Sequence, residues 1–369
     1  MQSLARNGYT TDQVKKALHA SNRTMSFRYE LLDKQNQFKK HLDNVLSASV
    51  ANNALAQINR TATFSLREDG SINYLSDRIK PYARLKMSDG GWVEWPLGVF
   101  VLSTPPRKTD ISGIVIREVE AYDLLQVVLD DKVDDRYTVT SGTNYITAVK
   151  TLLDSAGLTG HNLTATSKTL PADRDWQPGT TKLEIINDLL RAINYRSLFM
   201  DENGGAVAQT YVSPSDRASE YTYKDDHDSV IFPEVEHSLD LFEVANKWVL
   251  VVTEPDREPL VSTYTNTSSN SPTSTVNRGR TIVDYREYQE AADQSSLDAR
   301  AKRIAFEASQ VYEHVDFETA IMPMHSDSDI YTLEFSKLGI SAKYSEHTWS
   351  FDLKTGARMK HRIRRVISI

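Results

Sequence analysis

Three polar side chains within five positions of one another are the residues best placed to bind a divalent ion. His325, Asp327 and Asp329 bring together an imidazole and two carboxylates, which are common ligands of such ions. A polar turn between the apolar segments 321–322 and 331–333 explains the same residues without an ion. We take the turn as the simpler interpretation, expect no metal, and keep this cluster as the alternative.

The sequence contains no motif for nucleophilic catalysis, phosphate binding or zinc-dependent proteolysis. Its nine histidines are scattered, and the absence of cysteine excludes thiol nucleophiles, disulfides and cysteine-ligated metals. Neighbouring acids such as Asp130 and Asp134 could act in glycoside hydrolysis, but acids of this kind in loops are usually solvated. We therefore expect no catalytic residue, no cofactor and no enzymatic activity.

A basic strip near the end of the sequence is a local excess of charge in a chain whose net charge is -7. A strand over 359–369 would place Lys360, Arg362 and Arg364 on one face. Such a row could line a lumen through which DNA passes, or dock on an acidic neighbour. A solvated edge strand protected by charge explains it equally well. The strip consists of Lys354, Arg358, Lys360, Arg362, Arg364 and Arg365.

Three tryptophans near turns could contribute a binding surface. Trp92 and Trp95 flank a valine and a glutamate, and Trp176 lies in a loop that contains a proline. Exposed tryptophans can stack on sugars or anchor protein interfaces. A position in the core or at a protein interface is the more common one, and we favour it over glycan binding.

The bulk composition indicates a folded protein of more than one domain. With 369 residues, 40% of them hydrophobic, the chain has enough apolar material for two or three packed domains. The acidic net charge argues against a protein that coats nucleic acid. No run of about 20 apolar residues is present to span a bilayer, and the first residues lack the apolar segment of a secretion signal.

Two regions of alternating hydrophobicity surround a helical middle. A short helix capped by Thr10 is predicted over 10–20, and the turn at 89–91 predicts a hairpin. In the first β region, strands are predicted at 26–31, 61–66, 83–87, 99–102 and 116–122. In the middle, helical spacing predicts one helix over 143–156 and another from Thr181, followed by a hairpin over 197–209.

The last third of the chain returns to strands. Segment 246–252 is apolar enough for a central strand, and 347–353 alternates like a half-buried one. A helix is predicted over 295–310. Segment 262–276 is almost purely serine, threonine and asparagine, which predicts a long exposed loop.

These patterns predict a β-rich α+β protein in which two β-barrel-like domains flank a small helical α+β domain. The predicted limits are 1–24 for an N-terminal helical arm and 25–135 for the first β domain. The middle domain covers 136–235, and the second β domain, with one helix, covers 236–369.

Several segments resemble the hub proteins of bacteriophage tail tips and baseplates. Segment 95–101 (WPLGVFV) followed by 118–125 (EVEAYDLL) is similar to the first β domain of these hubs. Further segments resemble minor tail proteins of siphophages that infect Gram-positive hosts: 142–145, 182–190, 194–195, 246–248 and 349–351. The resemblance extends from about residue 25 to the end of the sequence.

The resemblance implies a structural subunit of the virion that is made in the host cytoplasm. In hubs of this kind, including those of contractile tails and type VI secretion spikes, three chains form a pseudo-sixfold ring. The ring would connect the tail tube and distal tail ring to tip or receptor-binding proteins, and surround the exit path of the DNA and the tape-measure protein. Because the sequence stops at Ile369, wall hydrolysis or receptor recognition is expected in another subunit. A carbohydrate-binding tail protein and a cell-wall hydrolase are the alternatives.

Overall fold

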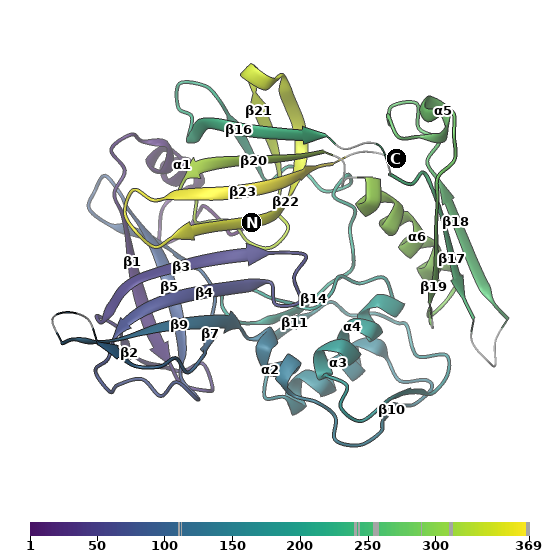
Figure 1. The fold of residues 1–369 in the computed structure, drawn as a ribbon, viewed down its shortest axis with the longest axis horizontal. Helices are drawn as coiled ribbons and strands as arrows, with labels where there is room; N and C mark the ends of the chain where they lie inside the picture. Colours follow the sequence, from purple (N-terminus) through teal and green to yellow (C-terminus); the bar gives the residue numbers. More distant parts are fainter. Residues whose placement is uncertain are drawn as a thin grey trace.

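A large sheet, a helical unit and a small helix-covered sheet make up the molecule (Figure 1). The structure is a computed structural model, and it describes residues 1–366 except 110, 112, 240–241, 243, 254–257, 289 and 310–312. Strand residues outnumber helical ones by 41% to 17%, which confirms the β-rich α+β class. None of the helices in the described ranges is both long and apolar enough to cross a membrane.

The large sheet is built from both ends of the chain. Its N-terminal strands are β1 (Met25–Leu32), β2 (Phe38–His41), β3 (Val45–Asn53), β4 (Arg60–Arg67), β5 (Arg78–Lys86), β6 (Trp92–Pro96), β7 (Phe100–Leu102), β8 (Lys108–Thr109) and β9 (Val115–Asp123). Its other strands are β15 (Tyr221–Lys224), β16 (Ile231–Leu239), β20 (Glu313–Ala320), β21 (Ile330–Phe335), β22 (Ile340–Asp352) and β23 (Arg358–Arg365), with the short helix η1 (Ser336–Leu338) before β22.

One strand pair joins the two β regions. β3 and β22 are antiparallel, with Val50 opposite Phe351 and Asn52 opposite Trp349. The main path through the sheet is β16-β20-β23-β22-β3-β4-β9-β7-β5-β1-β2, and a single apolar core includes residues of both regions. The predicted barrel-like description is therefore corrected to an open sheet in the described part of the chain, because the path does not close on itself. The predicted domain limits stay a prediction.

The N-terminal helix is ordered by its cap and by the large sheet. In α1 (Thr11–His19), the Thr10 side chain accepts a hydrogen bond from the backbone of Gln13, which confirms the predicted cap. Val14 and Leu18 of this helix are buried in the shared core. The sheet thus holds this arm in place.

The turn at 89–91 connects β5 to β6, a strand that the sequence patterns did not predict.

The helical middle has its own core and confirms the predicted helices and hairpin. Its elements are α2 (Leu125–Asp130), β10 (Tyr137–Val139), α3 (Tyr145–Ser155), β11 (His161–Leu163), β12 (Arg174–Trp176), α4 (Lys182–Ala192), β13 (Phe199–Met200) and β14 (Ala206–Ala208). Asn144 caps α3, and Thr181 caps α4 by accepting from the backbone of Glu184. The apolar faces of the three helices pack together, so this unit buries its own hydrophobic residues.

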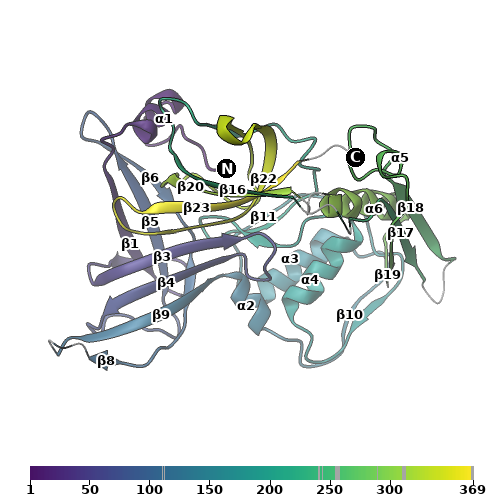
Figure 2. The same ribbon diagram turned by 45° about the horizontal axis from the view of Figure 1, so that its top comes forward.

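The small sheet carries one helix on one of its faces. It contains β17 (Lys247–Val252), β18 (Leu260–Thr265) and β19 (Val283–Tyr288), with β17 in the centre, and is followed by α6 (Gln294–Ser309). Figures 1 and 2 place α6 on the side of this sheet that faces the rest of the molecule. Trp248, Leu250 and Val252 are buried there against the helix. Residue 310, the predicted end of the helix, lies outside the described residues.

The prediction of a long exposed loop over 262–276 is wrong. Residues 262–265 belong to β18, and the chain then folds into a compact turn that ends in α5 (Thr275–Arg278). Asn266, Ser271 and Thr273 are buried, although all are polar. Their side chains bond one another, as in the contact of 2.8 Å from Asn266 Nδ2 to Ser271 Oγ. Hydrogen bonding therefore lets this polar segment pack without an apolar core.

Candidate functional site

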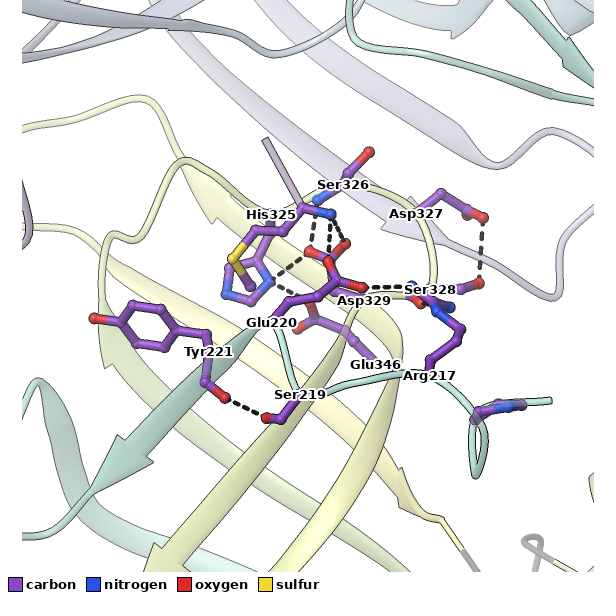
Figure 3. Close-up of polar contacts among 12 residues, drawn as sticks. Arg217, Ser219, Glu220, Tyr221, His325, Ser326, Asp327, Ser328, Asp329 and Glu346 are labelled. Carbon is purple, nitrogen blue, oxygen red and sulfur yellow. Dashed lines mark hydrogen bonds and ion pairs between the residues drawn. The ribbon is translucent and has the colours of Figure 1, made fainter. Parts of the chain in front are cut away.

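Four ionisable side chains from distant parts of the sequence meet inside the large sheet. His325 and Asp329 come from the turn between β20 and β21, whereas Glu346 lies on β22 and His361 on β23. All four are at most 3% exposed. Figure 3 shows His325, Asp329 and Glu346 pointing toward one another. We call these four residues the buried network.

Glu346 lies between the two imidazoles. Its Oε2 is 2.5 Å from His325 Nδ1, and its Oε1 is 2.5 Å from His361 Nδ1. The outer nitrogens of the imidazoles contact hydroxyl groups: His325 Nε2 lies 2.7 Å from the Tyr223 hydroxyl, and His361 Nε2 lies 2.9 Å from Thr319 Oγ1. Each histidine is thereby held at both ring nitrogens.

The N-terminal ammonium group closes one side of the network. The Met1 nitrogen lies 2.7 Å from Asp329 Oδ1 and 2.6 Å from Glu220 Oε2. The second carboxylate oxygen of Asp329 is 3.1 Å from His325 Nδ1. The start of the chain and the loop before β15 are thus tied to the same buried charges.

Burial and neighbouring charges act against each other in this network. Burial alone would lower the pKa of His325, but the carboxylates of Glu346 and Asp329 raise it to about 9. Burial would likewise raise the pKa of Asp329, yet His325 and the Met1 ammonium hold it well below its usual range. For His361, burial outweighs the contact with Glu346 and lowers the pKa. The charges then balance: Asp329 and Glu346 face the His325 imidazolium and the ammonium.

The three residues kept as the alternative metal cluster are only partly brought together. His325 approaches Asp329, but Asp327 pairs with Arg196 instead. The ligand atoms of His325, Glu346 and His361 all lie within 4.8 Å of one another, and could therefore hold an ion. Ligand atoms of a tetrahedral zinc ion lie about 2.0–2.2 Å from the metal, and so roughly 3.3 Å or more from each other. Glu346 lies only 2.5 Å from each Nδ1, which is shorter than the spacing between two ligands of one ion. The distances are therefore those of hydrogen bonds between the carboxylate and the imidazoles.

The basic strip pairs mainly with acids of the neighbouring strands. Arg362 lies 2.7 Å from Asp316, Arg365 lies 2.9 Å from Glu313, and Arg358 lies 3.0 Å from Glu318. Lys354 and Lys360 are exposed. Arg364 is half-buried and, among the described residues, has no acidic partner. Arg364 therefore differs from the other three arginines of the strip, each of which has an acidic partner.

Two of the three tryptophans are buried, and the paired acids are exposed. Trp95 is fully buried, and Trp176 is 6% exposed. Trp92 is half-buried beneath the guanidinium of Arg84, which lies 4.5 Å from its ring centre. Asp130 and Asp134 are exposed at the surface of the helical unit. The tryptophan positions therefore match the core interpretation.

Two motifs that carry the resemblance have structural roles. Gly98 has a φ of 136°, and a Cβ atom there would lie 2.8 Å from the Phe100 ring. The buried carboxylate of Asp123 accepts backbone hydrogen bonds of 2.9 Å from Arg60 and Leu125, thereby linking β4 to the start of α2. Burial raises the pKa of Asp123 to about 6. The motifs thus fix where the sheet meets the helical unit.

Sequence comparison finds no matching family model and no matching curated protein. Comparison of the fold does find similar solved structures. A tail protein from Neisseria meningitidis MC58 superposes with a TM-score of 0.66 at 10% identity, over 92% of this chain and 97% of the other. The 43 kDa tail protein of prophage MuSo2 from Shewanella oneidensis gives 0.61 at 8% identity, over 91% and 98%.

A third solved structure extends the similarity. Prophage tail protein gp18 from Listeria monocytogenes EGD-e superposes with a TM-score of 0.54 at 13% identity, over 91% of this chain and 94% of the other. The chain has the fold of phage tail proteins. This confirms the relationship in fold that the motifs of 95–101 and 118–125 predicted. At these identities the comparison concerns the fold and not the activity.

Proposed function

We propose that this chain is a structural subunit of a phage tail tip, in which three copies form a pseudo-sixfold hub ring. The ring would link the tail tube and distal tail ring to tip proteins, and surround the path of the DNA and the tape-measure protein. The tail-protein fold supports this proposal because it covers 92% of the chain, including both β regions and the helical middle. Such a subunit acts by its shape and its contacts, and it needs no catalytic centre.

The strand pair β3–β22 gives the subunit the stiffness that a ring requires. It fuses the two β regions into one sheet with one core, so the two regions cannot rotate independently. The buried network lies in this sheet and ties β22, β23, the turn before β21 and the N-terminus together. Two β regions held at a fixed angle in each copy are what a threefold ring with pseudo-sixfold contacts needs.

The observation that carries the assembly is an apolar face on the small sheet, opposite α6. Strand pairing places Val249 beside Tyr285, and Val251 beside Val261. Val261, Val283 and Tyr285 are each more than half exposed. Trp248, Leu250 and Val252, which alternate with Val249 and Val251 along β17, face α6. We call Val249, Val251, Val261, Val283 and Tyr285 the outer face. Lys247 and Glu287 border this apolar cluster on the same face of the sheet. An exposed apolar cluster with a polar rim usually marks a protein contact.

The outer face can be tested by charge. In sedimentation velocity over a range of concentrations, wild-type protein is expected to form trimers, and Tyr285→Asp is expected to stay monomeric. Leu75→Asp is the matched control, because Leu75 is 87% exposed and lies far from the outer face in the loop before β5. Equal assembly of both variants, or a wild-type protein that remains monomeric at every concentration, would contradict the proposal.

A further inference from the structure

A cavity of about 690 Å³ lies where the three parts of the molecule meet. It is bordered by the loop after β3, the segment between α4 and β13, the segment after β14, the second half of α6, and strands β22 and β23. Five guanidinium groups line it, and we call it the arginine cleft. They belong to Arg196, Arg217, Arg286, Arg303 and Arg364.

Four of the five arginines of the cleft have acidic partners. Arg217 pairs with Glu220 and Arg286 with Asp284, two acids that do not line the cleft. The carboxylates that line it are Glu307 and Asp327, which pair with Arg303 and Arg196. Arg364 also lines the cleft but has no acidic partner in the part of the chain that the structure describes. This concentration of guanidinium groups stands out in a chain whose net charge is -7. A bound carboxylate would supply the partner that Arg364 lacks.

Two further lining groups are short of hydrogen bonds. The Tyr211 hydroxyl and His347 Nδ1 are buried and have no partner among the described residues. Burial and the nearby charge of Arg364 lower the pKa of His347 to about 3, so its ring is neutral and one of its nitrogens can donate. Buried polar groups are normally paired, so these two point to an acceptor that the chain itself does not provide.

The rest of the lining fits a peptide better than a nucleic acid. Apolar side chains border the cleft, and Leu55 and Val212 among them are 62% and 49% exposed. The aromatic faces that could stack on bases are covered by guanidinium groups: Arg196 lies 4.6 Å from the Phe199 ring centre, and Arg303 lies 4.3 Å from that of Tyr211. Single-stranded nucleic acids are usually held by open basic grooves with free stacking surfaces.

We propose that the arginine cleft binds a segment of another protein in which acidic and apolar residues alternate, with one carboxylate on Arg364. The cleft volume lies in the range of about 300–1,000 Å³ that is typical of pockets for compact ligands. This site is separate from the outer face, so it goes beyond ring assembly. Binding here would attach a neighbouring protein at the junction of the sheet and the helical unit.

The test is fluorescence anisotropy with a fluorescein-labelled peptide of alternating glutamate and leucine. We expect Arg364→Gln to weaken binding about tenfold, the loss for one charge-assisted hydrogen bond. Arg362→Gln is the matched control, because it removes the same charge from the same strand but its partner is Asp316, outside the cleft. The control should bind as the wild type does.

Val212→Asp provides a second variant at the exposed rim, where the new charge should repel the peptide without disturbing a buried group. It keeps the test valid if Arg364→Gln does not fold. A peptide with glutamine in place of glutamate should not bind. The proposal is overturned if the glutamine peptide binds equally, if Arg362→Gln loses as much affinity as Arg364→Gln, or if an oligothymidylate of equal charge binds more tightly.

Discussion

Glu346→Gln tests whether the buried network stabilises the sheet. Glu346 is 1% exposed and contacts two imidazoles at 2.5 Å each. The neutral glutamine leaves the His325 imidazolium with Asp329 as one of its two carboxylate partners. Removing one partner of a buried ion pair costs about 3–5 kcal/mol of the free energy of unfolding. Glu334→Gln is the control, because Glu334 pairs with Lys224 at an exposed position and its loss should cost about 0–1 kcal/mol. Urea denaturation measures both.

The same variant changes how stability depends on pH. Because the pKa of His325 is raised to about 9 in the folded chain, the unfolded chain binds fewer protons between pH 6.5 and 9. The contribution of His325 is complete below its unfolded pKa, and is lost as the pH rises through 9. The wild type should therefore lose about 3 kcal/mol over this window. The raised pKa of the Met1 ammonium adds to the decline.

In Glu346→Gln the decline between pH 6.5 and 9 should be smaller, because the main carboxylate that raises the His325 pKa has gone. The reasoning is refuted if the two glutamine variants lose equal stability. It is also refuted if the wild type becomes more stable as the pH rises through this window.

Three further outcomes follow from the structure. Gly98→Ala should lower the free energy of unfolding by about 2–3 kcal/mol, because Gly98 has a positive φ and a Cβ there would contact the Phe100 ring. Thermal melting measures this, and an unchanged melting temperature would contradict it. Thr10→Ala should cost about 1 kcal/mol by removing the cap of α1, with the exposed Thr267→Ala as a neutral control. Dialysis against a chelator should leave the melting temperature unchanged, since the buried network is spaced for protons; a drop would instead indicate an ion at His325 and Glu346.

Local patterns in the sequence predicted much of the fold. Alternation predicted β4 and β9, and helical spacing predicted α3 and α4, because each of these elements buries one face of its own. The pairing of β3 with β22 was not predictable in this way, because it joins strands about 300 residues apart. The exposed loop predicted over 262–276 was wrong because side chains of this segment satisfy one another by hydrogen bonds, which composition does not reveal.

The candidate site was predictable in part. His325 and Asp329 were identified because they are close in sequence, whereas Glu346 and His361 reach them only through the sheet. A signal for His361 was present: the alternation that places Arg362 and Arg364 on one face of β23 places His361 on the other, buried face. The arginine cleft had no such signal, because its residues come from separate elements.

Electron cryomicroscopy of the isolated chain tests the hub proposal most directly. We predict particles of three copies with threefold symmetry, in which the outer face with Val261 and Tyr285 is buried between copies. The two β regions of each copy should then alternate around a central opening. Single copies, or twofold pairs whose outer faces remain exposed, would contradict the proposal.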